Sequence, residues 1–174
     1  MDSPFVSDEH REAFARYGRA HFAIQTLEYE LVNTYSVLSL LPERNGVEDA
    51  AWEGRVDDFF DTSFTHTFGT MLGKIKKTGR LPAELLARLE ACKPERDFLV
   101  HRFFRFYIEG GAPPDQLEAA MIARSDAACD VFMALNRDLE AFSHGMAERF
   151  GITAQMIADE IEADQTARQR SGDV

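Results

Sequence analysis

Glu95-Arg96-Asp97-Phe98-Leu99-Val100-His101-Arg102-Phe103-Phe104-Arg105 places an arginine, an acid and a histidine inside a strongly apolar run. A helix that is apolar on nearly all sides is expected to be buried on several of them. Burying a charge is unfavourable unless the charge is paired, so such a helix must either pair Arg96, Asp97 and His101 or use them. This stretch therefore predicts a helix at the centre of the packing and also a place for chemistry.

The rest of the chain shows the three-and-four spacing of apolar residues that is typical of helices, with no long strand alternation, internal repeat or low-complexity segment. Helices are predicted over residues 8–41, 47–77, 81–92, 94–109, 115–150 and 153–163. Glycines at 110, 111 and 151 are expected to end helices, and Pro94 is expected to kink or restart one. Long antiparallel helices with short loops predict an all-α, up-and-down bundle of four or five helices in a single domain, residues 1–174, with about 164–174 as a frayed polar tail.

The amino-acid composition is consistent with a single domain that does not need disulfide bonds for its stability. The chain has 174 residues, of which 45% are apolar, including 14 phenylalanines, so a sizeable core is available. Cys92 and Cys129 are far apart, which excludes a cysteine zinc site and a disulfide framework. Neither a secretory leader nor a membrane span is visible, and we expect a cytoplasmic protein that does not associate with membranes.

The charge of the chain is unevenly distributed. The net charge is −11, which weighs against an obligate nucleic-acid binder. Residues 71–105 nevertheless carry nine bases against four acids, a net charge of +5 that leaves −16 for the remainder. Two interpretations are open, because lysines favour the negative end of a helix dipole and a basic cluster can also bind phosphate. The candidate phosphate-binding residues are Lys74, Lys76, Lys77, Arg80, Arg102 and Arg105.

Helix geometry relates the three polar residues of the opening stretch. Asp97 and His101 are four residues apart and lie on one face, so Asp97 could hold the imidazole in one tautomer. Arg96 lies about 140° around the helix from His101, which is a poor position for acting on one atom from a single helix. Two copies packed across a two-fold axis would bring each arginine to the other's histidine. The excess apolar surface is also consistent with a homodimer.

The pattern Arg-x-x-x-x-His, here Arg96-Asp97-Phe98-Leu99-Val100-His101, on a helix of an all-helical chain resembles the HEPN (higher eukaryote and prokaryote nucleotide-binding) superfamily. The resemblance implies a four- or five-helix bundle that dimerises through the motif helix. In active members it implies a metal-independent endoribonuclease site, with catalytic roles for Arg96 and His101 and a supporting role for Asp97. Toxin members often have a tyrosine two residues after the histidine, where this chain has Phe103. That departure weighs against regulation by modification of the tyrosine and against pairing with a nucleotidyltransferase antitoxin.

The implied chemistry suits these residue types. RNA cleavage without a metal needs a base for the 2′-OH, an acid for the 5′-oxygen and a cation for the phosphorane, and histidine pairs and arginine supply them. We expect an endoribonuclease of toxin or defence type, with RNA as the candidate substrate and an antitoxin or another protein as the candidate partner. The alternative is a non-catalytic module that binds nucleotide, RNA or a protein, in which Arg96, Asp97 and His101 form a buried polar network.

Other polar residues point to ordinary structural roles. His21 and His66 are interpreted as core or interface histidines with satisfied nitrogens, and Gln25 and Glu28 either reach the motif histidine or lie on an exposed edge. No histidine follows a glutamate by three residues, which weighs against a di-metal carboxylate site. No metal site or cofactor is predicted. The remaining acidic cluster is interpreted as a solvated face: Asp57, Asp58 and Asp61.

Overall fold

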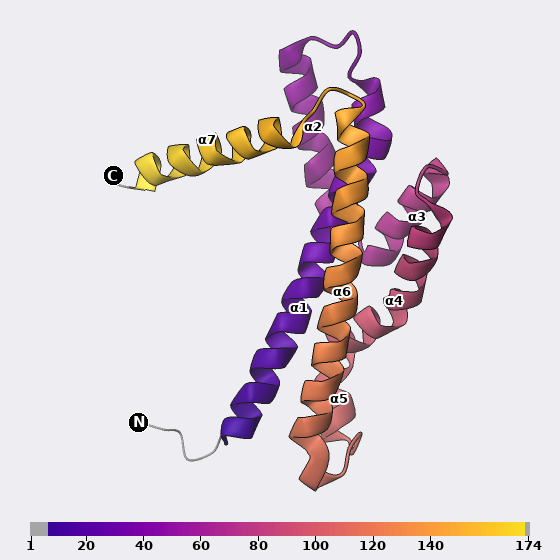
Figure 1. The fold of residues 1–174 in the computed structure, drawn as a ribbon, viewed down its shortest axis with the longest axis vertical. Helices are drawn as coiled ribbons and strands as arrows, with labels where there is room; N and C mark the ends of the chain where they lie inside the picture. The colour runs from indigo at the N-terminus through magenta and orange to yellow at the C-terminus, as the bar shows by residue number, and fades with distance from the viewer. Residues whose placement is uncertain (1–6, 173–174) are drawn as a thin grey trace.

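The computed structural model describes residues 7–172, and this part of the chain is helical without any β-strand, as the sequence predicts. The helices are α1 (Asp8–Tyr35), α2 (Asp49–Phe64), α3 (Phe68–Thr78), α4 (Ala83–His101), α5 (Phe103–Ile108), α6 (Leu117–Glu148) and α7 (Ala154–Gly172). The long helices α1 and α6 lie side by side along the molecule, with α3 and α4 beside them and α7 projecting away (Figure 1). No helix among the described residues is long and apolar enough to cross a membrane.

The most extensive contact, between α1 and α6, is a parallel one. Arg16 pairs with Asp126 toward the start of both helices, and Thr34 contacts Ser143 toward the end of both. Between α1 and α6 in the sequence, the chain runs back in the opposite direction along α4, which is antiparallel to both helices. The interface is filled from α1 by buried side chains at helical spacing: Ala13, Ala20, Ala23, Ile24, Leu27 and Leu31. Small residues allow the backbones to approach closely, and the buried leucines each contribute roughly 1.5–3 kcal/mol.

The first predicted helix, residues 8–41, is not α-helical throughout. The α-helix ends at Tyr35, and the chain continues as a π-helical turn (Ser36–Leu40) and a 3₁₀ turn (Leu41–Glu43) that contains Pro42. The Ser36 hydroxyl donates to the Asn33 carbonyl and the Ser39 hydroxyl to the Tyr35 carbonyl. These side chains compete with the backbone ladder, which explains why the last turns differ from the prediction.

The predicted second helix, residues 47–77, is divided into α2 and α3. The division is made at Thr67, whose backbone is extended and whose hydroxyl accepts from the amide of Thr70 as a helix cap. The apolar periodicity of the sequence continues across Thr67, so it did not indicate a helix cap at this residue. The consequence is that α3 turns back and pairs with α4, which positions the motif helix.

The helix break expected at Pro94 lies instead at Arg102. Pro94 is inside α4 at an exposed position, and the helix continues through it although proline removes one backbone hydrogen bond. Arg102 leaves helical geometry, with φ of −132°, and α5 begins directly after it. The motif therefore occupies the last two turns of α4. Its flanking apolar residues are only partly covered, since Phe106 and Ile108 are exposed.

The predicted glycine stops are confirmed. Gly110 has φ of +94° and Gly151 has φ of +80°, values that favour glycine. The amides of Gly111 and Ile152 each reach back five residues, to the carbonyls of Phe106 and Ala147, at 2.9 and 3.2 Å. The last helix differs from its prediction, because α7 continues past residue 163 to Gly172. The first six and last two residues, including the end of the predicted tail, lie outside the described residues.

Candidate functional site

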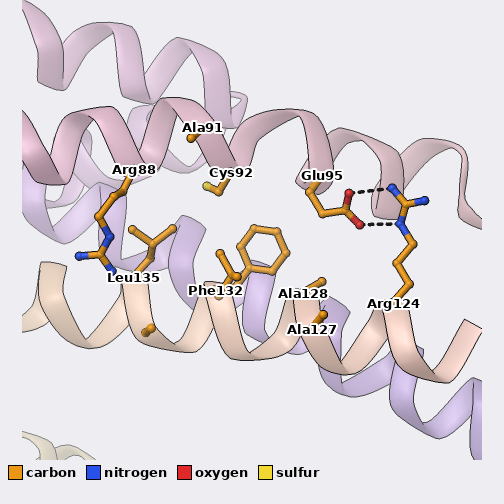
Figure 2. Close-up of a pocket in the computed structure, with 11 residues that line it drawn as sticks. Arg88, Ala91, Cys92, Glu95, Arg124, Ala127, Ala128, Phe132 and Leu135 are labelled. Atoms are coloured by element: carbon orange, nitrogen blue, oxygen red, sulfur yellow. Dashed lines mark hydrogen bonds and ion pairs between the residues drawn. The ribbon is translucent and has the colours of Figure 1, made fainter.

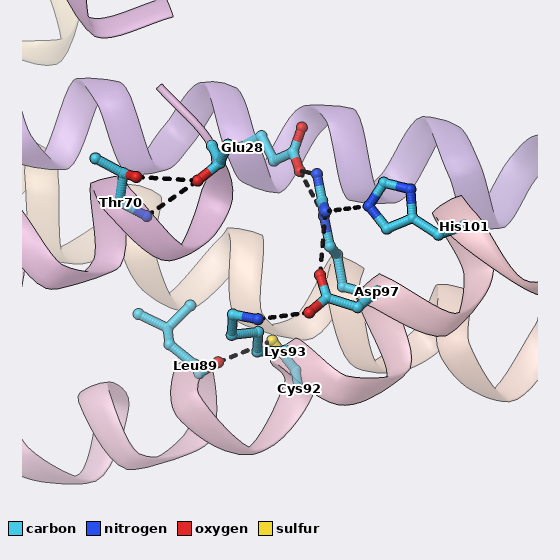
Figure 3. Close-up of polar contacts among 9 residues, drawn as sticks. Glu28, Thr70, Leu89, Cys92, Lys93, Asp97 and His101 are labelled. Carbon is cyan, nitrogen blue, oxygen red and sulfur yellow. Dashed lines mark hydrogen bonds and ion pairs between the residues drawn. The ribbon is translucent and has the colours of Figure 1, made fainter. Parts of the chain in front are cut away.

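Arg96 is the centre of a polar network that joins α4 to α1. Figure 3 labels its partners Glu28, Asp97 and His101. Its side chain is 13% exposed. The Nε atom donates to Glu28 Oε1 at 2.7 Å, Nη2 donates to the same oxygen, and Nη1 donates to Asp97 Oδ1 at 3.1 Å. The Phe68 ring lies 5.8 Å from the guanidinium carbon. Three of the five donor directions of the guanidinium are thus held by two carboxylates, which fixes its plane.

Asp97 supports Arg96 rather than the histidine. Its Oδ2 accepts from Lys93 Nζ at 2.5 Å, one helical turn earlier. The hydrogen bond from Lys93, followed by that from Arg96, lowers the pKa of Asp97 below its ordinary value. No hydrogen bond joins Asp97 to His101 in the part of the chain that the structure describes. The structure therefore differs from the expectation that Asp97 holds the imidazole.

Arg96 and His101 meet within one chain. The Nη1 atom of Arg96 is 3.5 Å from Nε2 of His101, whose side chain is exposed at the end of α4 (Figure 3). The expectation that one helix keeps them apart is wrong, because the flexible arginine side chain reaches around the helix surface. Arginine can only donate, so this contact is a hydrogen bond only when Nε2 carries a lone pair and the imidazole is neutral.

Glu28 is a site residue that the sequence left open between two interpretations. It contacts Arg96, not the histidine, and Gln25 donates to its second oxygen at 3.3 Å. With Lys93 and Asp97, the network contains two cations and two carboxylates and is neutral overall. An anion that binds Arg96 must therefore compete with Glu28.

The basic residues predicted to bind phosphate do not gather at this network. Lys76 pairs with Glu90 at 2.6 Å, and Arg80 donates to the Leu38 carbonyl at 2.8 Å, so both lie near the turn between α3 and α4. Lys77 is in the last turn of α3 with Lys76, where lysines favour the helix dipole. Lys74 lies 5.4 Å from the centre of the Tyr35 ring.

Arg102 and Arg105 lie at the other side of the motif. Both are exposed, and Arg102 directly follows His101. Arg105 pairs with Glu109 at 2.9 Å, but that pair is widely exposed and is worth little in water. The structure thus separates the basic residues into two groups along α4, with the Arg96 network between them.

A second site was missed by sequence reasoning. Arg124 of α6 donates to both oxygens of Glu95 at 2.7 Å and stacks over Phe98 at 3.5 Å. This pair closes one end of a groove of about 800 Å³ between α4 and α6 (Figure 2). Arg88 lies at its other end and pairs with Asp138 at 2.6 Å. Glu95 belongs to the opening stretch, but nothing in the sequence points to Arg124, which is 29 residues away.

The two histidines expected to be satisfied are not. His66 Nε2 and His21 Nδ1 are buried and have no hydrogen-bond partner among the described residues. His66 lines a small cavity of about 180 Å³ that also includes Gln25, Glu28 and Tyr29. The acidic cluster Asp57, Asp58 and Asp61 is exposed, as predicted. Within residues 7–172, no three His, Cys, Asp or Glu side chains are grouped as metal ligands.

Comparisons of this chain with protein-family models, with curated proteins and with solved structures found no match.

Proposed function

We propose that the protein is a HEPN-like, metal-independent endoribonuclease of toxin or defence type, with His101 and Arg96 in the active site. The single observation that carries the proposal is the contact of 3.5 Å between Arg96 Nη1 and the exposed His101 Nε2. A proton-transfer group is thereby placed next to a planar cation that suits phosphate.

In the proposed reaction, one neutral histidine removes the proton of a ribose 2′-OH, and the 2′-oxygen attacks the adjacent phosphorus. The bond from phosphorus to the 5′-oxygen breaks, and a protonated histidine gives its proton to that oxygen. The products are a 2′,3′-cyclic phosphate and a 5′-hydroxyl. Arg96 would bind the non-bridging oxygens, whose charge is redistributed in the transition state. Asp97 and Lys93 would act by positioning Arg96.

The reaction needs two proton-transfer groups, and each chain brings one histidine to Arg96. We therefore propose a homodimer in which two motif helices approach and each contributes His101. The exposed Phe106 and Ile108, which follow the motif on α5, support an apolar contact there. Arg102 and Arg105 would then flank the shared site and bind neighbouring phosphates, whereas the group containing Lys76 and Arg80 lies near the turn between α3 and α4.

A second function, binding or assembly without catalysis, is favoured by one specific observation. The Arg96 guanidinium is already bound by Glu28 and Asp97, and its side chain is largely buried. A cation held in this way can join α1 to α4 and have no other task. In that case the network stabilises the fold, and phosphate has no access to it.

The test is induced expression of the wild type beside Arg96→Ala and His101→Ala, with growth and total RNA followed for each. Arg88→Ala and His10→Ala are matched controls, because these residues form their own pairs with Asp138 and Glu118. Purified proteins are then compared on a single-stranded RNA in the presence of a chelator. We expect each site variant to lower the cleavage rate by at least about a hundredfold while the controls retain it. Intact RNA with folded wild-type protein would favour the second function.

A further inference from the structure

A large cavity lies on the other face of α1 from the Arg96 network, beside the C-terminal parts of α1 and α6. It has a volume of about 730 Å³ and is bounded by α1, by the last turns of α6 and by the start of α7, which leaves the bundle there (Figure 1). This volume falls within the range of small-molecule sites, roughly 300–1,000 Å³. Part of its wall is apolar and consists of Val37, Leu41, Ala147, Ile152 and Ile157.

Glu30 is the buried acid of this cavity. The residue is 8% exposed, and its carboxyl group contacts Ser143 Oγ at 2.6 Å and Asn33 Nδ2 at 3.1 Å. No lysine, arginine or histidine forms an ion pair with it among the described residues. Burial is the main cause of a raised pKa, to which the nearby Glu140 adds; the hydrogen bonds from Ser143 and Asn33 and the charge of His144 act in the opposite direction.

The contacts of Ser143 indicate which form of Glu30 fits the empty cavity. Besides Glu30, the Ser143 oxygen contacts the Leu139 carbonyl and the Thr34 hydroxyl, both at 2.9 Å. A hydroxyl group donates one hydrogen bond and accepts two. An ionised Glu30 accepts from Ser143, and this hydrogen bond competes with the Leu139 carbonyl for the single hydroxyl proton. All three contacts can be hydrogen bonds at once when a protonated Glu30 donates to Ser143 instead, Thr34 also donates to Ser143, and Ser143 donates to Leu139.

One further polar atom of the cavity wall lacks a hydrogen-bond donor. Asn136 Oδ1 is buried and has no partner among the described residues. Glu140 lies on the rim, and His144 is the one titratable base among the residues that line the cavity. A carboxyl group, a second acid and an unused amide oxygen together favour a ligand that donates hydrogen bonds and carries positive charge.

We propose that this cavity binds a small aliphatic amine in its ammonium form. The ammonium group would donate to Glu30 and to Asn136 Oδ1, and the hydrocarbon part would lie against Val37, Leu41 and Ile157. The apolar wall suits an alkyl chain better than a hydrated metal ion, which needs several oxygen ligands. The site is separate from the proposed ribonuclease site and does not depend on it.

Binding would exchange one proton for one ammonium ion at Glu30. Where Glu30 is protonated in the empty cavity, it must lose its proton to form the ion pair, so amine binding there should release protons. The affinity should rise with pH as Glu30 ionises, and should fall again where the amine itself loses its charge. Glu140 and His144 face the same cavity, so their substitution should shift the profile without abolishing binding.

The experiment is calorimetric titration of the full chain with n-butylamine, repeated in two buffers of different ionisation enthalpy to count released protons. The uncharged n-butanol is the matched control ligand. Glu30→Gln keeps the size and the hydrogen bonds and removes the charge, and Glu148→Gln, at an exposed position on the same end of α6, is the matched control variant. We expect Glu30→Gln to weaken amine binding by at least about tenfold and Glu148→Gln to leave it unchanged.

A second variant tests the cavity independently, so that the proposal can be tested even if Glu30→Gln does not fold. Ala158→Phe places a ring at an exposed position that lines the cavity, and it should weaken binding without touching the buried polar groups. The proposal is overturned if the wild type does not bind the amine at millimolar concentrations, if n-butanol binds equally well, or if Glu30→Gln binds like the wild type. None of these results depends on RNA cleavage.

Discussion

Glu28 and Glu30 are two residues apart on α1, yet they occupy opposite electrostatic surroundings. Because a helix turns about 100° per residue, the two carboxyl groups point about 200° apart, one toward α4 and the other toward α6. Glu28 contacts the Arg96 guanidinium and is 24% exposed, whereas Glu30 is 8% exposed and faces Ser143 and Asn33. The difference teaches that the partner across the interface, and not the residue type, decides which acid forms an ion pair.

The largest loss of stability is expected from replacing Arg96, the cation that pairs with Glu28. Arg96→Met leaves Glu28 and Asp97 without their shared donor, and should lower the free energy of unfolding by about 1–3 kcal/mol in urea titrations. Arg88→Met is the control, because its pair with Asp138 is exposed on both sides and should contribute at most about 1 kcal/mol. Equal losses for the two variants would contradict the comparison.

The stability contributed by Glu30, the acid without an ion pair among the described residues, should fall as pH rises. The pKa of Glu30 is raised in the folded protein, so the stability contributed by its protonated form is present at low pH and declines as pH rises through the folded pKa. Glu30→Gln should therefore be as stable as the wild type in acid and more stable at neutral pH, an effect smaller than that of Arg96→Met. Thermal unfolding measured across this pH range tests it, and a variant less stable at neutral pH would be the contrary result.

The stability contributed by Asp97 should change with pH in the direction opposite to that of Glu30. Its pKa is lowered by Lys93 and Arg96, so its contribution is present above the ordinary aspartate pKa and is lost as pH falls through the folded value. Asp97→Asn should reduce stability at neutral pH and make the acid side of the profile flatter. The same unfolding measurements follow it. An unchanged acid slope would indicate that the hydrogen bond from Lys93 does not persist in solution.

The smallest change in stability is expected for an ion pair between two exposed side chains. Lys76→Ala removes the exposed contact with Glu90 and should change the free energy of unfolding by less than about 1 kcal/mol. If the basic group near the turn between α3 and α4 binds RNA, the same variant should weaken RNA binding although stability is preserved. Filter binding at two salt concentrations separates these effects.

Local chemistry was predicted well where it acts over a few residues. The all-helical class follows from apolar periodicity, and the helix stops predicted at Gly110 and Gly151 are confirmed by a positive φ at both residues, which favours glycine. The cap at Thr67 was missed, since the apolar pattern continues across it. The helix does not restart at Pro94, because α4 continues through this residue to His101 although proline removes one backbone hydrogen bond.

The sequence by itself determined that Arg96, Asp97 and His101 share one helix, that the charges there need partners, and that the chain is helical. Only the tertiary structure decided which partners they have. Arg96 meets Glu28 across 68 positions of sequence, Arg124 meets Glu95 across 29, and Glu30 meets Ser143 across 113. The physical reason is that periodicity defines which face of a helix is buried, whereas the partner on that face depends on how α1, α4 and α6 pack, including the parallel contact of α1 with α6.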